Sequence, residues 1–243
     1  MKIIIIFILS LTIFNVNGQN KEGVAIYNSQ LYMSLNTDSI DDKDVKSNLS
    51  KILNQTNNSE ELEFELKFSK EKSMFTYLQK LENESNSNLN INLISAKNLG
   101  QIYTNIKSDE KVTYSKVFDK QFLIVENLSS QKWKLINESK LIGKYKCYKA
   151  TTQKELYRRN GNRMIVVTAW YTPEIPLSFG PLGYGNLPGL IVELNEGNSF
   201  HYFLKSINYK KIPIIIKPSK GKIVSIKEFN DEMTEIYLKK IKI

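Results

Sequence analysis

Hydrophobic and polar residues alternate along much of this chain, most regularly in Leu62–Phe68. In this stretch every second residue is leucine or phenylalanine, and the residues between them are charged. Neighbouring side chains of a β-strand point to opposite faces, so the pattern predicts a strand with one buried and one solvent-facing side. After a short turn at Ser69–Lys72, the stretch Met74–Leu81 alternates in the same way. We therefore expect the two stretches to pair as a hairpin.

Further short strand-like runs recur along the chain, separated by turn signals such as Asn160-Gly161, which is typical of tight hairpins. Many short strands at this spacing indicate an antiparallel sheet. The other expected strands are Gly23–Leu35, Gln101–Lys107, Lys111–Phe118, Phe122–Glu126, Trp133–Asn137, Gly143–Thr152, Met164–Tyr171, Leu190–Leu194, Phe200–Ile207 and Ile212–Ile216.

Helical periodicity replaces this alternation in two places. Ser225 and Glu228 have the spacing of a capping box, and apolar residues follow at helical intervals, which predicts a helix over Ser225–Lys240 that packs on the sheet. Asp41–Asn54 predicts a short amphipathic helix, and the Asn- and Ser-rich tract Asn83–Asn90 predicts a loop. The expected fold is mainly β (α+β): a curved antiparallel sheet or half-barrel covered on one face by the C-terminal helix.

The N-terminus has the pattern of a signal peptide, with Met1-Lys2 before the apolar run Ile3–Ile13 and a polar end at Gly18. We expect cleavage after Gly18 and a mature chain of residues 19–243 that forms one domain. The protein would then be exported to the periplasm or beyond the cell, without a transmembrane segment, because the apolar run is too short to span a bilayer. The alternative is that this segment is retained as a strand or anchor.

The segment Ala169–Leu194 holds four of the six prolines and four of the eleven glycines. Proline restricts φ and glycine permits positive φ, so together they specify a shaped backbone. Because apolar strand-like runs precede and follow it, we expect an ordered connection between two core strands.

Within this segment, Asn186-Leu187-Pro188-Gly189-Leu190-Ile191 resembles the signature of the GLPGLI family of exported Bacteroidetes proteins. The preceding Trp170–Pro176 and Gly180-Pro181, and the upstream Ile142–Ala150, resemble other elements of that family. Asn186 stands where the family usually has glycine, and asparagine tolerates the left-handed conformation that such a turn needs. The family has no agreed activity, so the resemblance implies an exported β-rich protein rather than a reaction.

The same resemblance draws attention to Asp38-Ser39-Ile40, which is similar to the O-glycosylation sequon of exported Bacteroidetes proteins. Ser39 is therefore a candidate modification site. The alternative is an ordinary loop.

The inventory of reactive side chains is small. His201 is the only histidine and Cys147 the only cysteine, so an internal disulfide and a zinc site of the usual type lack ligands. We interpret Cys147 as a small buried hydrophobe and His201 as a structural strand residue. There is no P-loop and no complete dinucleotide fingerprint. We therefore expect no metal and no cofactor.

Paired carboxylates remain as an enzymatic alternative, since glycoside hydrolysis needs only two. Glu174 and Glu193 flank the signature and are the candidates. The structural interpretation, which we favour, is that Glu174 accepts loop N–H groups and Glu193 lies on the wet side of a strand.

Charge is unevenly distributed in a chain of net charge +9, with an acidic stretch at Asp38–Glu65 and a basic one at Lys132–Arg163. Aromatic residues interleaved with lysine and arginine are also typical of single-strand nucleic-acid platforms. We do not expect nucleic-acid binding, because an exported protein rarely meets nucleic acid.

These observations predict a non-enzymatic envelope protein whose concave face forms an apolar groove for a lipid or another small hydrophobic ligand. By fold analogy alone, the architecture would be similar to the half-barrel of periplasmic lipoprotein carriers. The alternatives are a scaffold partner of an envelope complex, in which the signature serves folding, and the carboxylate-dependent hydrolase. The expected groove residues are Trp170, Tyr171, Tyr184, Leu187, Pro188, Gly189, Leu190 and Ile191.

Overall fold

The computed structural model describes residues 22–31, 41–57, 61–79, 91–157, 161–197, 200–212 and 214–241. The expected signal peptide with its cleavage point at Gly18, the candidate glycosylation site Ser39 and the expected loop Asn83–Asn90 lie outside these described residues.

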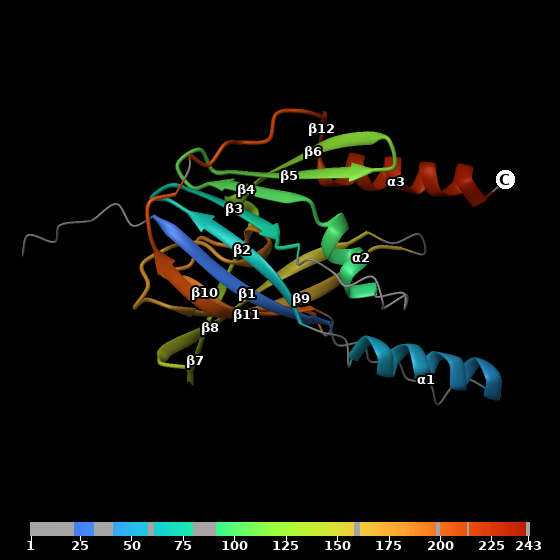
Figure 1. The fold of residues 1–243 in the computed structure, drawn as a ribbon, viewed down its shortest axis with the longest axis horizontal. Helices are drawn as coiled ribbons and strands as arrows, with labels where there is room; N and C mark the ends of the chain where they lie inside the picture. Colours follow the sequence, from blue (N-terminus) through green and yellow to red (C-terminus); the bar gives the residue numbers. More distant parts are fainter. Residues whose placement is uncertain are drawn as a thin grey trace, which may run out of the picture.

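All strands of the described residues belong to one open, curved sheet, which confirms the expected fold class (Figure 1). Their order across the sheet is β12-β6-β5-β4-β3-β2-β1-β11-β10-β9-β8-β7. The strands are β1 (Gly23–Leu31), β2 (Leu62–Phe68), β3 (Lys72–Tyr77), β4 (Gln101–Asn105), β5 (Glu110–Val117), β6 (Lys120–Asn127), β7 (Lys134–Ile142), β8 (Tyr145–Leu156), β9 (Arg163–Thr172), β10 (Leu190–Glu196), β11 (Phe200–Tyr209) and β12 (Lys222–Val224).

Two meanders form this sheet, one running from β1 to β6 and the other from β7 to β11. They join where β1 pairs antiparallel with β11, with a register shift at Ile26/Tyr27. Among the described strands the pairing is antiparallel except at one edge, where β12 runs parallel to β6. The chain therefore brings its two halves together at the centre of one curved layer.

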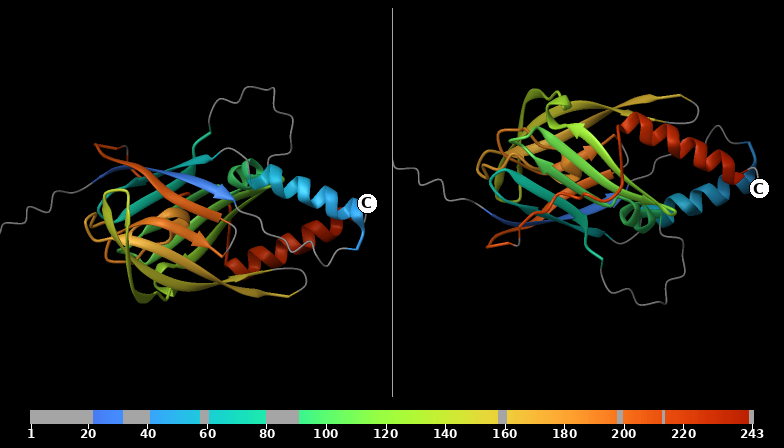
Figure 2. Two further views of the ribbon diagram at one scale, coloured as in Figure 1. Left: turned by 90° about the horizontal axis from the view of Figure 1, so that it is seen from below. Right: turned by 90° about the horizontal axis from the view of Figure 1, so that it is seen from above.

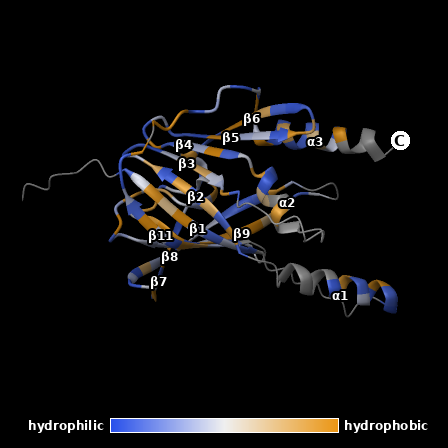
Figure 3. Cartoon of the chain, viewed as in Figure 1, coloured by the Kyte–Doolittle hydropathy of each residue, from blue (hydrophilic) through white to orange (hydrophobic). Residues whose placement is uncertain are grey.

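The alternating residues form the two faces of the sheet as expected. In β2, Phe64, Leu66 and Phe68 are buried, and the charged residues between them are more exposed. Because successive residues face opposite sides of the sheet, hydrophobic and hydrophilic residues both occur along each strand (Figure 3). The apolar side chains of β1–β4 and β8–β11 meet in one large cluster on the concave face.

The segment after β11 differs from the expectation. Ile212–Ile216 was predicted as a strand, but its described residues have no strand partner; they cross the outer face of the sheet toward β12. Ile212 and Ile215 are buried there in a cluster with Val24 and Leu123, among others. A strand needs a free edge to pair with, and a segment lying across a face has none. We call residues 210–221, except for 213, the outer strap (Figure 2).

Three helices accompany the sheet in the described residues: α1 (Lys43–Asn57), α2 (Ile91–Asn98) and α3 (Ile226–Ile241). The first corresponds to the expected amphipathic helix, whereas α2 and the short strand β12 were not predicted. Two short 3-10 turns, Leu128–Ser130 and Pro181–Gly183, complete the structure. No helix in the described part of the chain combines the length and the apolar character needed to cross a membrane.

The C-terminal helix begins with the predicted capping box. The Ser225 N–H donates to Glu228 Oε2 at 2.7 Å, and the Glu228 N–H donates to Ser225 Oγ at 3.2 Å. The expectation that α3 covers one face of the sheet needs correction, because the helix packs mainly on the β6/β12 edge and projects beyond it (Figures 1 and 2). Among the described side chains of α3, Phe229 and Met233 pack against the buried cluster at that edge, which consists of Phe122, Ile124 and Val224.

Replacing Phe229 by alanine tests this docking. The Phe229 ring meets Phe122 edge to face with 5.3 Å between ring centroids, and its loss is expected to cost about 1–3 kcal/mol locally. Hydrogen exchange of α3 and β12 amides should accelerate accordingly. Lys227→Ala, on the exposed side of the same helix, is the control and should leave exchange unchanged. Equal exchange in Phe229→Ala and the wild type would contradict the docking.

Candidate functional site

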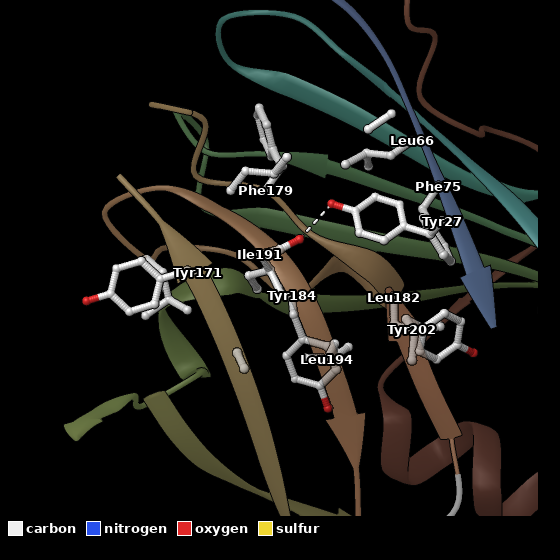
Figure 4. Packing of buried hydrophobic residues seen from close by; sticks show 14 of the residues in the cluster. Tyr27, Leu66, Phe75, Tyr171, Phe179, Leu182, Tyr184, Ile191, Leu194 and Tyr202 are labelled. Carbon is white, nitrogen blue, oxygen red and sulfur yellow. Dashed lines mark hydrogen bonds between the residues drawn. The ribbon is translucent and has the colours of Figure 1, made fainter. Parts of the chain in front are cut away.

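The Pro- and Gly-rich segment between β9 and β10 folds back into the hollow of the curved sheet. Ile175, Leu177, Phe179, Leu182 and Leu187 are all buried. They join one cluster with side chains from both halves of the sheet (Figure 4), including Tyr27, Leu66, Phe75, Tyr171, Ile191, Leu194 and Tyr202. We call residues 173–189 the plug, because they fill the concave face of the protein's own sheet.

The plug has a regular set of backbone hydrogen bonds. The Leu190 N–H donates to the Ile175 carbonyl at 2.9 Å, and the Ile191 N–H donates to the Phe179 carbonyl at 3.0 Å. Phe179 and Gly185 also form an isolated antiparallel bridge. A buried connection must satisfy its polar backbone groups, and these bonds do so for part of the plug, within it and against the start of β10. The expectation of an ordered connection between two core strands is therefore confirmed.

Several plug residues adopt backbone conformations that explain the glycines and the asparagine. Asn186 has φ of 60°, so it adopts the left-handed conformation expected of the residue that replaces glycine there. Gly189 has φ of 155°, and a Cβ at this position would collide with the Thr172 carbonyl oxygen. Leu182 is also left-handed, with φ of 57°, although it is buried. Such strain in a branched residue persists only where the surrounding packing enforces it.

Polar side chains from distant parts of the chain hold the plug in place. Trp133 Nε1 donates to the Gly185 carbonyl at 2.8 Å, and Gln131 Nε2 donates to the Gly183 carbonyl at 3.0 Å. The Gly185 N–H in turn donates to Gln131 Oε1 at 3.1 Å. On the opposite side, the buried Tyr27 hydroxyl donates to the Ile191 carbonyl at 2.7 Å (Figure 4). Gln131 and Tyr27 could not be predicted from sequence, because nothing in their local pattern indicates a partner so far along the chain.

Tyr184 connects the plug to a carboxylate on β10. Its hydroxyl donates to Glu196 Oε1 at 2.7 Å, and Lys154 Nζ donates to the same oxygen at 2.5 Å. Burial, reinforced by the negative charge of Glu196, raises the pKa of Tyr184. The hydroxyl therefore stays protonated as a donor, and the lysine compensates the largely buried carboxylate. The three side chains thus link the plug to β10 and β8 through polar contacts. Glu196 is a further residue that could not be identified from the sequence pattern.

Trp170 and Glu193 lie on the outer face, away from the plug. Neighbouring residues of a strand point to opposite faces, so Trp170 faces outward while Tyr171 enters the core. Lys140 Nζ lies 4.4 Å from the Trp170 ring centroid and 2.8 Å from Glu193 Oε2. Lys149 approaches the same ring at 5.9 Å. These contacts form a surface cation–π and ion-pair cluster.

His201 lies on β11, where its Nε2 is 2.7 Å from Asn195 Nδ2. Burial lowers the pKa of His201, although nearby Glu193 opposes this. The ring is therefore mainly neutral at pH 7, and its contact with Asn195 agrees with the structural role that we expected of it. Across the residues that the structure describes, no group of three or more His, Cys, Asp or Glu side chains is arranged to hold a metal ion.

The two candidate carboxylates have separate structural partners. Glu174 is exposed, and its Oε1 accepts the Lys146 N–H at 2.8 Å. Glu193 forms an ion pair with Lys140 on the solvent-facing side of β10. Glu193 thus lies on the solvent-facing side of its strand, as the structural interpretation expected, whereas Glu174 accepts an N–H of strand β8 rather than of a loop.

The expected groove residues are divided among three environments. The buried ones, Tyr171, Tyr184, Leu187, Gly189, Leu190 and Ile191, lie together in or beside the plug. Pro188 is exposed, as is Asn186. Trp170 is on the opposite face and does not join them. The structure therefore gathers most of the predicted residues, but as part of the packed core.

Comparison with known proteins gives a short family match and a shared fold. Residues 158–193 match the model of a family described as "Protein of unknown function (Porph_ging)", and no curated protein matches the chain. Two solved structures of PNGF-II are similar over 87% of this chain: the C2 crystal form at 14% identity with a TM-score of 0.51, and the P21 form at 13% with 0.49. The chain spans 32% and 33% of those chains. The first likeness shows a common fold and nothing more.

Substitutions in the plug should separate steric from conformational requirements. Gly189→Ala should cost more than about 3 kcal/mol of unfolding free energy, because the new Cβ collides with backbone. Gly161→Ala is the control: it also has positive φ, but open space surrounds it, so about 1 kcal/mol is expected. Asn186→Gly should be neutral within about 1 kcal/mol, whereas Asn186→Val should cost about 1–2 kcal/mol. Urea unfolding measures all four, and equal losses for Gly189→Ala and Gly161→Ala would contradict the packing.

Cys147 should resist thiol reagents in the folded protein. The side chain is buried, and burial raises its pKa from 9.0 to about 11. At pH 8 the reactive thiolate is then about a hundredfold scarcer than in an ordinary cysteine. Reaction with Ellman's reagent should accompany unfolding in urea. The matched control, Cys147→Ser with Lys144→Cys on an exposed turn, should react rapidly while folded. Comparable native rates for the two thiols would show that Cys147 is accessible.

Proposed function

We propose that this chain is an exported, non-enzymatic protein of the GLPGLI family that serves as a scaffold or interaction partner in a bacterial cell envelope. The family assignment is supported by Asn186–Ile191 and by the overlap of residues 158–193 with a family model of unknown function. Export is supported by the apolar run Ile3–Ile13 and the polar end at Gly18. The signature segment, on this proposal, is a folding element.

The observation that carries the proposal is that the signature side chains pack into the protein's own core. Leu187 is 2% exposed, and Leu190 and Ile191 are completely buried. These side chains are the ones that would have to line an apolar groove for a lipid. Their burial against strands of both meanders supports the scaffold alternative over the ligand groove that the sequence favoured.

The placement of the reactive groups also supports a non-enzymatic protein. Glu174 accepts a backbone N–H, and Glu193 is paired with a lysine. Catalytic carboxylates of glycosidases instead face one another across a substrate cleft. The outer surface, with the Trp170 cluster and the outer strap, is the part of the molecule that remains accessible to a partner.

The test combines ligand detection with stability. The protein is purified from a cell envelope under mild conditions and measured by native mass spectrometry, and its melting temperature is recorded with and without palmitate. We expect an unliganded mass and no shift in melting temperature, because no lipid competes with the plug. Leu187→Ala should lose about 2–4 kcal/mol of unfolding free energy.

The control is Pro188→Ala, since Pro188 is exposed beside the same backbone; it should cost about 1 kcal/mol or less. Copurifying lipid, or a palmitate-induced stabilisation that Leu187→Ala abolishes, would favour the groove and overturn the scaffold proposal. The mass of the purified chain also tests cleavage after Gly18.

A further inference from the structure

The outer strap presents large apolar side chains directly to solvent. Ile214 is 86% exposed and Ile216 is 75% exposed. Among the large hydrophobic residues of the described chain, Ile214 is the most exposed, and Ile216 shares the next value with Leu141. Exposed side chains of this size gathered in one segment commonly mark an interaction site.

The packing of the strap keeps these isoleucines outside. Ile212 and Ile215 are the residues of the strap that turn inward, and they are buried on Tyr103, Val112 and Leu123 of the sheet. With those two side chains fixed in the core, Ile214 and Ile216 point the other way. Burying them would require the inner pair to leave a cluster that also includes residues of β1 and β4–β6.

A third isoleucine lies on the same face of the sheet. Ile223 of β12 is in register with Leu123 of β6, and side chains at paired positions of adjacent strands lie on the same face. Leu123 belongs to the outer cluster beneath the strap, so Ile223, which is 73% exposed, also faces outward. The apolar surface thus extends from the strap to the β12 edge.

Exposed lysines accompany these isoleucines. Those of the strap are Lys210, Lys211, Lys217 and Lys220. Lys217 contacts Glu110, whereas Lys222 of β12 is in register with Phe122 on the opposite face and contacts Glu232 of α3. Lys210, Lys211 and Lys220 have no acidic partner among the described residues, so the strap carries an excess of positive charge beside its apolar side chains.

We propose that this face docks on an anionic lipid surface, with Ile214 and Ile216 entering the interfacial region and the lysines contacting lipid headgroups. Apolar residues flanked by lysine or arginine are the combination that peripheral proteins use at anionic membranes. Lysine stems can lie along the apolar boundary while their ammonium groups stay in the headgroup layer. Two isoleucines on the strap and one on β12 present far less than the about 800 Å² per partner of a stable protein interface. The proposal goes beyond the scaffold function and does not depend on what the plug does.

The experiment is a vesicle flotation assay. It uses the full chain in the form in which it is recovered from the expressing cell. The vesicles are phosphatidylcholine alone or phosphatidylcholine with 30% phosphatidylglycerol. We expect binding to the anionic vesicles, little binding to the neutral ones, and a decrease on adding 0.5 M NaCl, which screens the charges. The double variant Ile214→Ser/Ile216→Ser and the triple variant Lys210→Gln/Lys211→Gln/Lys220→Gln should each weaken binding at least about tenfold.

Met164→Ser/Val166→Ser is the matched control. Both residues are apolar and 54% exposed, but they lie on β9, so this variant should bind like the wild type. Because every variant starts from the same chain, any contribution of residues 1–18 cancels in the comparison. All substituted side chains are exposed, and unchanged melting temperatures verify folding.

Absence of binding to anionic vesicles overturns the proposal, as does equal loss of binding in the control and the Ile214→Ser/Ile216→Ser variant. Binding that the strap variants leave intact also overturns it. The scaffold function is tested by the native mass and by the response to palmitate, and neither measurement depends on vesicle binding. Either proposal can therefore be contradicted without affecting the other.

Discussion

The structure depends on covering the concave face of an open, curved sheet. Each inward-facing strand residue contributes apolar surface, and a sheet that does not close leaves that surface facing a hollow. The chain covers it with the connection between β9 and β10, which folds back over the strands and enters the core through Phe179, Leu182 and Leu187. Because this connection contacts both meanders, it also holds the two halves of the sheet in their curvature.

A connection buried in this way needs partners for its polar backbone groups. Within the plug, β-bridge and turn hydrogen bonds supply many of them. Others come from side chains far away in sequence: Trp133 and Gln131 precede the second meander, and Tyr27 belongs to β1. Two residue choices in the segment reflect the same close packing: approach to other backbone excludes a Cβ at Gly189, and Asn186 adopts a left-handed conformation.

The two faces of the sheet consequently have different chemistry. The concave face is occupied by the protein's own side chains, among them the polar group of Tyr184, Glu196 and Lys154. The outer face carries the Trp170 cluster and the lysine-rich outer strap. The proposals for a scaffold and for a lipid-docking face both concern this outer face.

The sequence by itself determined the features that depend on local periodicity and on single-residue conformations. Alternation predicted the strands and the hairpin at Leu62–Phe68, the Ser225/Glu228 spacing predicted the start of α3, and the choice of asparagine at Asn186 predicted its left-handed turn. These succeed because the relevant interactions join residues within a few positions of one another. Glu174 lies outside the reach of such reasoning, because its partner is not a loop N–H but that of Lys146 on β8, 28 residues away.

Only the tertiary structure decided what each apolar segment packs against. Ile212–Ile216 has the composition of a strand, yet it crosses a face because the sheet offers it no free edge there. Trp170 was expected in the groove but faces outward, since strand register assigns alternate residues to opposite sides. Whether the signature lines a groove or fills it depended on contacts between segments such as β3 and the plug, about a hundred residues apart. No pattern within a short window contains that information, because such contacts form only when the chain closes on itself.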